Sequence, residues 1–225
     1  MFIGHYGVGL AGRATLRGTP AKPPAMPSLG TWFMAVQWLD LVWPLGILSG
    51  VERVNITGSD NPFLVLQFVH YPWSHSLLMA VVWAVLFGAV YRWRTGNGRG
   101  ALWLGGGVFS HWVLDLIVHV PDLPLYPGSD IKLGLGLWQS VPVTLVVEFG
   151  LLGACAVYYL RVTRPRDAIG RWACWALLAF LALGYLGSMY GPPPPSVVAL
   201  GISALVMLWL LVVWAYWVDR HREPR

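Results

Sequence analysis

Long apolar runs separated by short polar loops dominate the chain. Six of these runs are each about 20 residues long, which is the length a helix needs to cross the hydrocarbon core of a bilayer. The pattern predicts an all-α polytopic membrane protein with six transmembrane helices in a single domain over residues 1–225. The predicted spans are 29–48, 74–91, 100–120, 138–160, 172–190 and 196–218.

A shorter apolar stretch, residues 1–12, precedes the first predicted span. As a helix it would be about 18 Å long at 1.5 Å per residue, which is too short to cross a bilayer. Two interpretations remain open. The stretch either stays outside the membrane, or it forms an extra half-helix that enters the bilayer from the cytoplasmic face and brings His5 to mid-depth.

The basic residues alternate from loop to loop. In chain order, the segments outside the six spans hold three, one, three, one, four, none and three Lys or Arg residues. The positive-inside rule then places both termini in the cytoplasm of a multi-pass protein of the plasma (inner) membrane. The net charge of +5 is explained by this topology, so we expect no nucleic-acid partner and instead expect membrane lipids around the chain.

Only 11% of the residues are charged, against about 25% in soluble domains, so ionisable groups inside the spans stand out. The third span carries His111, Asp115 and His119, four residues apart, which keeps them on one helical face. Two imidazoles and one carboxylate suit a divalent metal, most often zinc, with manganese or iron as alternatives.

Other polar residues fall at a similar depth. Asp40 and Glu148 lie near the middle of their spans. His75 lies in the first turn of the second span, and His70 lies in the loop before it because Pro72 breaks the backbone between them. These groups could also be helix–helix hydrogen bonds that hold no ligand. As a site, they give two sets. The predicted metal ligands are His75, His111, Asp115, Asp40 and His5, and the candidate proton acceptors are Glu148, His70 and His119.

Several short motifs recur in one known group of proteins. They are His5 near the start, the acidic Asp40 in the first span, H-x-x-x-S-H-S at residues 70–76, and G-x-x-S-H-x-x-x-D at residues 107–115. Over residues 1–150 the chain resembles the inner-membrane metal-dependent hydrolases of bacteria, a group that includes the LexA-binding membrane proteins. The resemblance implies a polytopic helical protein with a His/Asp metal centre and a hydrolase activity.

The chain departs from that group at two points. Relatives often have P-D-x-D in the first span, where this chain has Gln37-Trp-Leu-Asp40, so Trp38 replaces one carboxylate. A polar residue near the end of the third-span motif is Val118 here. The lost carboxylate weakens the case for a two-metal site.

Three functions are compatible with the sequence. The first is metal-dependent hydrolysis of a lipid-like ester or phosphoester at a site in the outer half of the membrane. The second is a non-catalytic accessory or assembly subunit of a larger membrane-protein complex. The third is a proton or ion carrier that uses the same His, Asp and Glu side chains.

Overall fold

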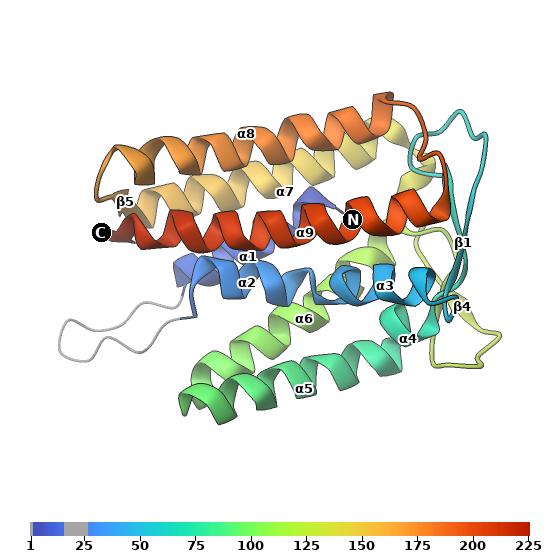
Figure 1. Cartoon of the computed structure of the whole chain (residues 1–225), viewed down its shortest axis with the longest axis horizontal. Helices are drawn as coiled ribbons and strands as arrows, with labels where there is room; N and C mark the ends of the chain where they lie inside the picture. Colours follow the sequence, from blue (N-terminus) through green and yellow to red (C-terminus); the bar gives the residue numbers. More distant parts are fainter. Residues whose placement is uncertain (1, 16–26) are drawn as a thin grey trace.

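A computed structural model describes residues 2–15 and 27–225 as a helical bundle with short strands at its two ends (Figure 1). Arg17 and Lys22, two of the three basic residues that precede the first predicted span, lie outside these ranges. The helices are α1 (Ile3–Thr15), α2 (Leu29–Val36), α3 (Trp38–Leu48), α4 (Pro72–His75), α5 (Leu77–Thr95), α6 (Gly98–Val118), the 3₁₀ turn η1 (Leu137–Gln139), α7 (Val141–Val162), α8 (Ala168–Tyr190) and α9 (Val197–Arg220).

The strands form three antiparallel pairs in the described part of the chain. The pair β1 (Arg53–Ile56) and β2 (Leu66–His70) and the pair β3 (Leu123–Pro124) and β4 (Lys132–Leu133) follow α3 and α6. The third pair, β5 (Thr163–Pro165) and β6 (Arg222–Pro224), joins the segments that follow α7 and α9. Strands therefore occur only where the predicted loops lie.

The number of spans agrees with the sequence prediction. Within the described residues, α5, α6, α7, α8 and α9 are each long and apolar enough to cross a membrane, and α2 with α3 makes a sixth, bent span. The second span begins at Leu77 rather than at the predicted Ser74, because the Ser76 hydroxyl accepts the Met79 amide and caps α5. The all-α polytopic fold is confirmed.

The bent span is broken at Gln37. The axes of α2 and α3 differ by 53°, and Gln37 has φ −109° and ψ 11° between them. The break places Asp40 in the first turn of α3, where the helix dipole favours a negative charge. Non-helical backbone at membrane depth is tolerated where protein surrounds it, and Gln37 is fully buried.

The short helix α1 lies inside the bundle. At its beginning, Glu148 from the first half of α7 accepts hydrogen bonds from the amides of Phe2 and Gly4. At its end, Arg13 donates to Asp219 near the end of α9 at 2.8 Å. The helix thus runs from mid-depth to the end of α9. This is the half-helix, one of the two interpretations that the sequence left open.

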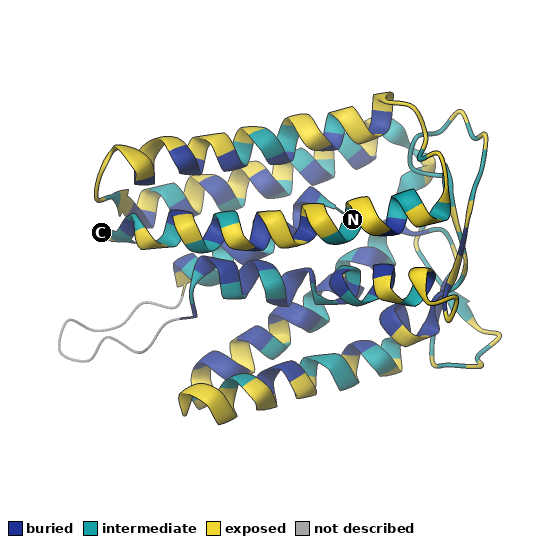
Figure 2. Cartoon of the chain, viewed as in Figure 1, coloured by how far each residue is buried: buried dark blue, intermediate teal, exposed yellow. Residues whose placement is uncertain are grey.

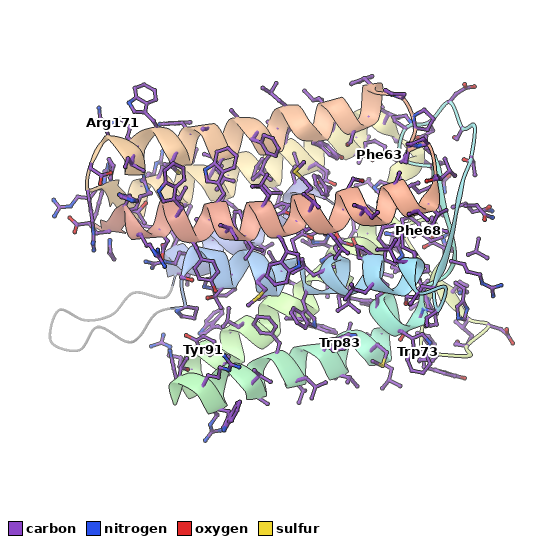
Figure 3. The ribbon with its side chains drawn as sticks, in the orientation of Figure 1. Phe63, Phe68, Trp73, Trp83, Tyr91 and Arg171 are labelled. Atoms are coloured by element: carbon purple, nitrogen blue, oxygen red, sulfur yellow. The ribbon has the colours of Figure 1, made fainter. Side chains whose placement is uncertain are left out.

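The two ends of the bundle can be told apart by their labelled side chains (Figure 3). Arg171 and Tyr91 lie at the end where α9 finishes, whereas Phe63, Phe68 and Trp73 lie at the end with β1 and β4. The first end holds the predicted cytoplasmic charges. The outward faces of the long helices are exposed and apolar (Figure 2), with Val85, Leu183 and Val206 each more than 60% exposed. Lipid chains are the surroundings that such faces require.

Close packing between α2 and α9 gives a first testable prediction. A Cβ at Gly30 would lie 2.2 Å from the ring of Tyr216, whose hydroxyl also bonds to Thr31 at 2.8 Å. We expect Gly30→Ala to destabilise the protein by about 1–3 kcal/mol through overpacking. Gly153→Ala is the matched control, since its Cβ meets open space. Thermal unfolding in detergent checks this, and equal midpoints for the two variants would contradict the packing.

Candidate metal centre

Five side chains that the sequence analysis selected as metal ligands lie together in the interior. They come from four helices that are distant in sequence, and two overlapping triads among them could hold a metal ion: His5, His111 and Asp115, and Asp40, His75 and His111. In each triad the potential ligand atoms lie within 4.8 Å of one another. All but Asp40 are buried, and the structure brings the five residues together.

Asp115 contacts all three histidines of the cluster. Its Oδ1 lies 3.1 Å from Nε2 of His5, and its Oδ2 lies 3.1 Å from Nε2 of His111 and 3.7 Å from Nε2 of His75. Asp40 adds a second carboxylate, with Oδ1 3.4 Å from Nε2 of His75 and 3.7 Å from Nε2 of His111. Two carboxylates thus face three imidazole nitrogens across one small space.

A backbone hydrogen bond fixes the orientation of His111. Its Nδ1 lies 2.7 Å from the carbonyl oxygen of Val36, the last residue of α2 before the break. Because a carbonyl can only accept, Nδ1 carries a hydrogen, and in the neutral ring the lone pair is on Nε2, the atom that faces the carboxylates. This Nε2 is buried and lies 3.1 Å from Oδ2 of Asp115. A ligand atom held in this way is the usual arrangement around metal-binding histidines.

The His5 ring is stacked on the His111 ring. The two ring centroids are 3.8 Å apart and the ring planes differ by 4°. Both rings are fully buried. The Nε2 atom of His5 faces the Asp115 carboxylate, where it can bond either to that carboxylate or to an ion beside it.

The distances fit a divalent ion. Ligand atoms at about 2.0–2.1 Å from a tetrahedral zinc ion lie about 3.3 Å from one another. The nitrogen–oxygen separations in the cluster run from 3.1 to 3.7 Å. The donor set of imidazole and carboxylate suits zinc, manganese and iron. The buried His and Asp groups could therefore hold a metal ion, and the geometry does not select among these metals.

A hydrogen-bond chain behind His75, which ends at a buried carboxylate, was not predicted from the sequence. Nδ1 of His75 lies 2.7 Å from Oγ of Ser74, and that hydroxyl donates to the buried Glu52 at 2.8 Å. The N-cap of α5 is therefore Ser76 and not Ser74, whose hydroxyl is engaged by Glu52. Glu52 lies in the loop after α3, and no spacing pattern in the sequence connects it to His75.

His119 lies near the cluster but is not one of the residues that could share an ion. The helix α6 ends at Val118, so His119 leaves the helical face of His111 and Asp115. Its Nδ1 lies 2.8 Å from Oδ1 of Asp122, and the Tyr71 hydroxyl donates to the same oxygen at 2.6 Å. Burial, together with the Asp122 charge, raises the pKa of Tyr71 well above its usual value, which keeps the phenol a donor.

The other two candidate proton acceptors have different surroundings. Both carboxylate oxygens of Glu148 accept backbone amides, from Phe2 at 2.8 Å and Gly4 at 2.7 Å. His70 lies in strand β2, opposite Arg53, rather than in the predicted loop. Neither belongs to the two metal triads of the described residues.

A cavity of about 200 Å³ adjoins the cluster. Asp40, His75 and Asp115 form part of its wall, and His119 and Glu148 also line it. The remaining wall is mainly apolar and aromatic. Its apolar and aromatic residues are Phe2, Trp43, Pro62, Phe63, Leu66, Phe68, Trp138 and Tyr185.

The bundle and the cluster define the class of protein: a multi-pass helical membrane protein with a buried His/Asp group that could bind a metal ion. The chain belongs to the YdjM inner membrane protein family, whose sequence model matches residues 4–192. The match confirms the resemblance to an inner-membrane family and extends it through α8. The protein is thus integral to the inner membrane. No curated protein and no solved structure matches the chain.

Proposed function

We propose that this protein is a metal-dependent hydrolase that acts on a lipid-like ester or phosphoester inside the membrane. The observation that carries the proposal is the Asp115 carboxylate facing three histidines beside a cavity with mainly apolar walls. A divalent metal ion, when bound at this cluster, would supply Lewis acidity that activates water and polarises a carbonyl or phosphoryl oxygen.

The chain binds one ion in this proposal. His111 offers a single lone pair, at Nε2, because its Nδ1 is bonded to Val36. Both triads need that nitrogen, so they cannot each hold an ion at the same time. His75, His111, Asp40 and Asp115 would bind the ion. His5 would either join them or orient Asp115 through its 3.1 Å contact.

His119 is the proposed proton acceptor. Asp122 accepts the hydrogen of Nδ1, which leaves Nε2 of His119 as the basic nitrogen of a ring that lines the cavity. The adjacent Trp138 ring, 4.1 Å away between centroids, restrains its orientation. His119 can therefore receive the proton of an attacking water and return it to the leaving group.

The cavity wall supports a substrate with an apolar part. Phe68 and Trp138 have ring centroids 6.3 Å apart, and both line the cavity next to His119. Aromatic walls bind hydrocarbon and exclude water. A substrate that carries an acyl or prenyl chain could place this chain against the aromatic rings and its ester against the cluster.

The test uses purified protein in phospholipid vesicles with Zn²⁺ or Mn²⁺. We expect release of fatty acid or phosphate from ester or phosphoester lipids. His119→Ala should lower the rate by about 10²–10⁴-fold at unchanged metal content, and His70→Ala, which lies outside the cavity wall, should not. Retained metal without turnover on any lipid ester or phosphoester would contradict the hydrolase and favour the accessory-subunit alternative.

A further inference from the structure

The strongest unassigned feature of the molecule is the buried carboxylate of Glu52. It lies between α3 and β1, is 2% exposed, and accepts three hydrogen bonds from α4. Its Oε1 accepts the amides of Trp73 and Ser74 at 2.9 and 2.8 Å, and its Oε2 accepts the Ser74 hydroxyl at 2.8 Å. The carboxylate thus holds the residue next to His75 by both backbone and side chain.

The direction of these hydrogen bonds determines the tautomer of His75. A carboxylate can only accept, so the Ser74 hydroxyl hydrogen points to Glu52 and its oxygen lone pairs remain for His75. Nδ1 of His75, 2.7 Å away, must then carry the hydrogen. The lone pair of His75 is consequently on Nε2, the atom that faces Asp40 and Asp115.

We propose that Glu52 is a positioning residue that, through the Ser74 hydroxyl, fixes His75 in the tautomer that can bind a metal ion. A carboxylate behind a metal-binding histidine normally contacts the ring directly, and here a serine is interposed. The inference rests on the proposed metal centre. It assigns to Glu52 a role distinct from simple support of α4.

Glu52→Gln tests this role because it keeps the shape of the side chain and replaces one hydrogen-bond acceptor with a donor. The amide oxygen can still accept the Trp73 and Ser74 amides, whereas the amide nitrogen donates to the Ser74 hydroxyl. The hydroxyl hydrogen then turns to Nδ1 of His75 at 2.7 Å, since the other acceptor, the Tyr71 carbonyl oxygen, is 3.4 Å away. His75 would carry its hydrogen on Nε2 and would be lost as a ligand.

The measurement is the Zn²⁺ affinity of the purified full chain, obtained by competition with a chelator. We expect Glu52→Gln to weaken Zn²⁺ binding by about 10- to 100-fold, as changes to the groups that orient a metal-binding histidine commonly do. Glu223→Gln, in the half-exposed β6, is the matched control and should bind like wild type. Nitrogen NMR of ¹⁵N-histidine-labelled apoprotein should show that the hydrogen of one histidine ring has moved from Nδ1 to Nε2 in Glu52→Gln. The control variant should show no such change of tautomer.

A double-mutant cycle separates positioning from structural support. In a Ser74→Ala background the hydroxyl is absent, so Glu52→Gln should have no further effect on Zn²⁺ affinity. An equal loss in both backgrounds would mean that Glu52 only supports α4, which overturns the inference. If Glu52→Gln does not fold, Ser74→Ala and Ser74→Thr are compared instead. Zn²⁺ affinity should be weakened in Ser74→Ala and retained in Ser74→Thr, and equal affinities for the two variants overturn the inference.

The cycle also separates this inference from the proposed function. Wild-type protein that binds no Zn²⁺ removes the metal centre and both proposals with it. Wild-type protein that binds Zn²⁺, beside a Glu52→Gln variant that binds it equally well, removes only the role of Glu52.

Discussion

Asp115→Asn is expected to abolish metal binding at the proposed centre of the purified protein. Among the described residues, Asp115 is the carboxylate that contacts His5, His75 and His111, at 3.1, 3.7 and 3.1 Å. Asparagine has nearly the same shape but lacks the negative charge, and its amide nitrogen would face an imidazole nitrogen. The affinity should fall by more than the about 10- to 100-fold that changes behind the ligands cost.

The matched control for this change is Asp130→Asn, which alters an exposed carboxylate in the loop between β3 and β4. It should retain both metal and turnover. The three candidate functions differ for Asp115→Asn. A hydrolase loses metal and turnover together, an accessory subunit changes its assembly, and an ion carrier loses transport without loss of a bound metal. Retained metal with full hydrolytic activity would contradict the assignment of the site.

Glu148→Ala is expected to destabilise the protein strongly through the start of α1. Glu148 accepts the amides of Phe2 and Gly4, so alanine leaves a buried amide at the start of α1 without a partner. An unpaired buried donor costs about 1–3 kcal/mol, and two amides are involved here. Because His5 directly follows Gly4, α1 should loosen at the cluster and metal affinity should also fall.

Thermal unfolding in detergent measures this effect. Glu148→Gln keeps one accepting oxygen and should be destabilised less, and Glu223→Ala at the other end of the bundle should unfold like wild type. In the structure Glu148 anchors α1 through the Phe2 and Gly4 amides, whereas its position in the span predicts a proton acceptor. Loss of turnover in Glu148→Gln at unchanged stability and metal content would show that Glu148 acts as a proton acceptor and would contradict its role as the anchor of α1.

The convergence of the cluster follows from simple features of the sequence. His111 and Asp115 share a helical face through their spacing, and Asp40 and His75 are brought to them by depth alone. The position of His5 depended on α1 entering the bundle. Length excluded a full span for this segment but could not choose between a half-helix and a surface segment, because the choice depends on packing against α7.

Other parts of the site could not be read from spacing. The helical face that carries His111 predicts His119 beside it, but α6 ends at Val118 and turns His119 toward Asp122. Glu52 reaches Ser74 only because the chain between α3 and α4 folds into β1 and β2. The break at Gln37, which supplies the Val36 carbonyl to His111, also has no signal of its own in the apolar run.

Elemental analysis of the detergent-purified protein, with His111→Ala and His70→Ala beside wild type, tests the metal centre most directly. His111 belongs to both triads, whereas His70 lies in β2 outside them. We expect about one zinc, manganese or iron ion per wild-type chain, the same in His70→Ala, and none in His111→Ala. Wild-type protein without metal when purified in the absence of chelators, or equal metal in all three proteins, would contradict the proposed metal centre.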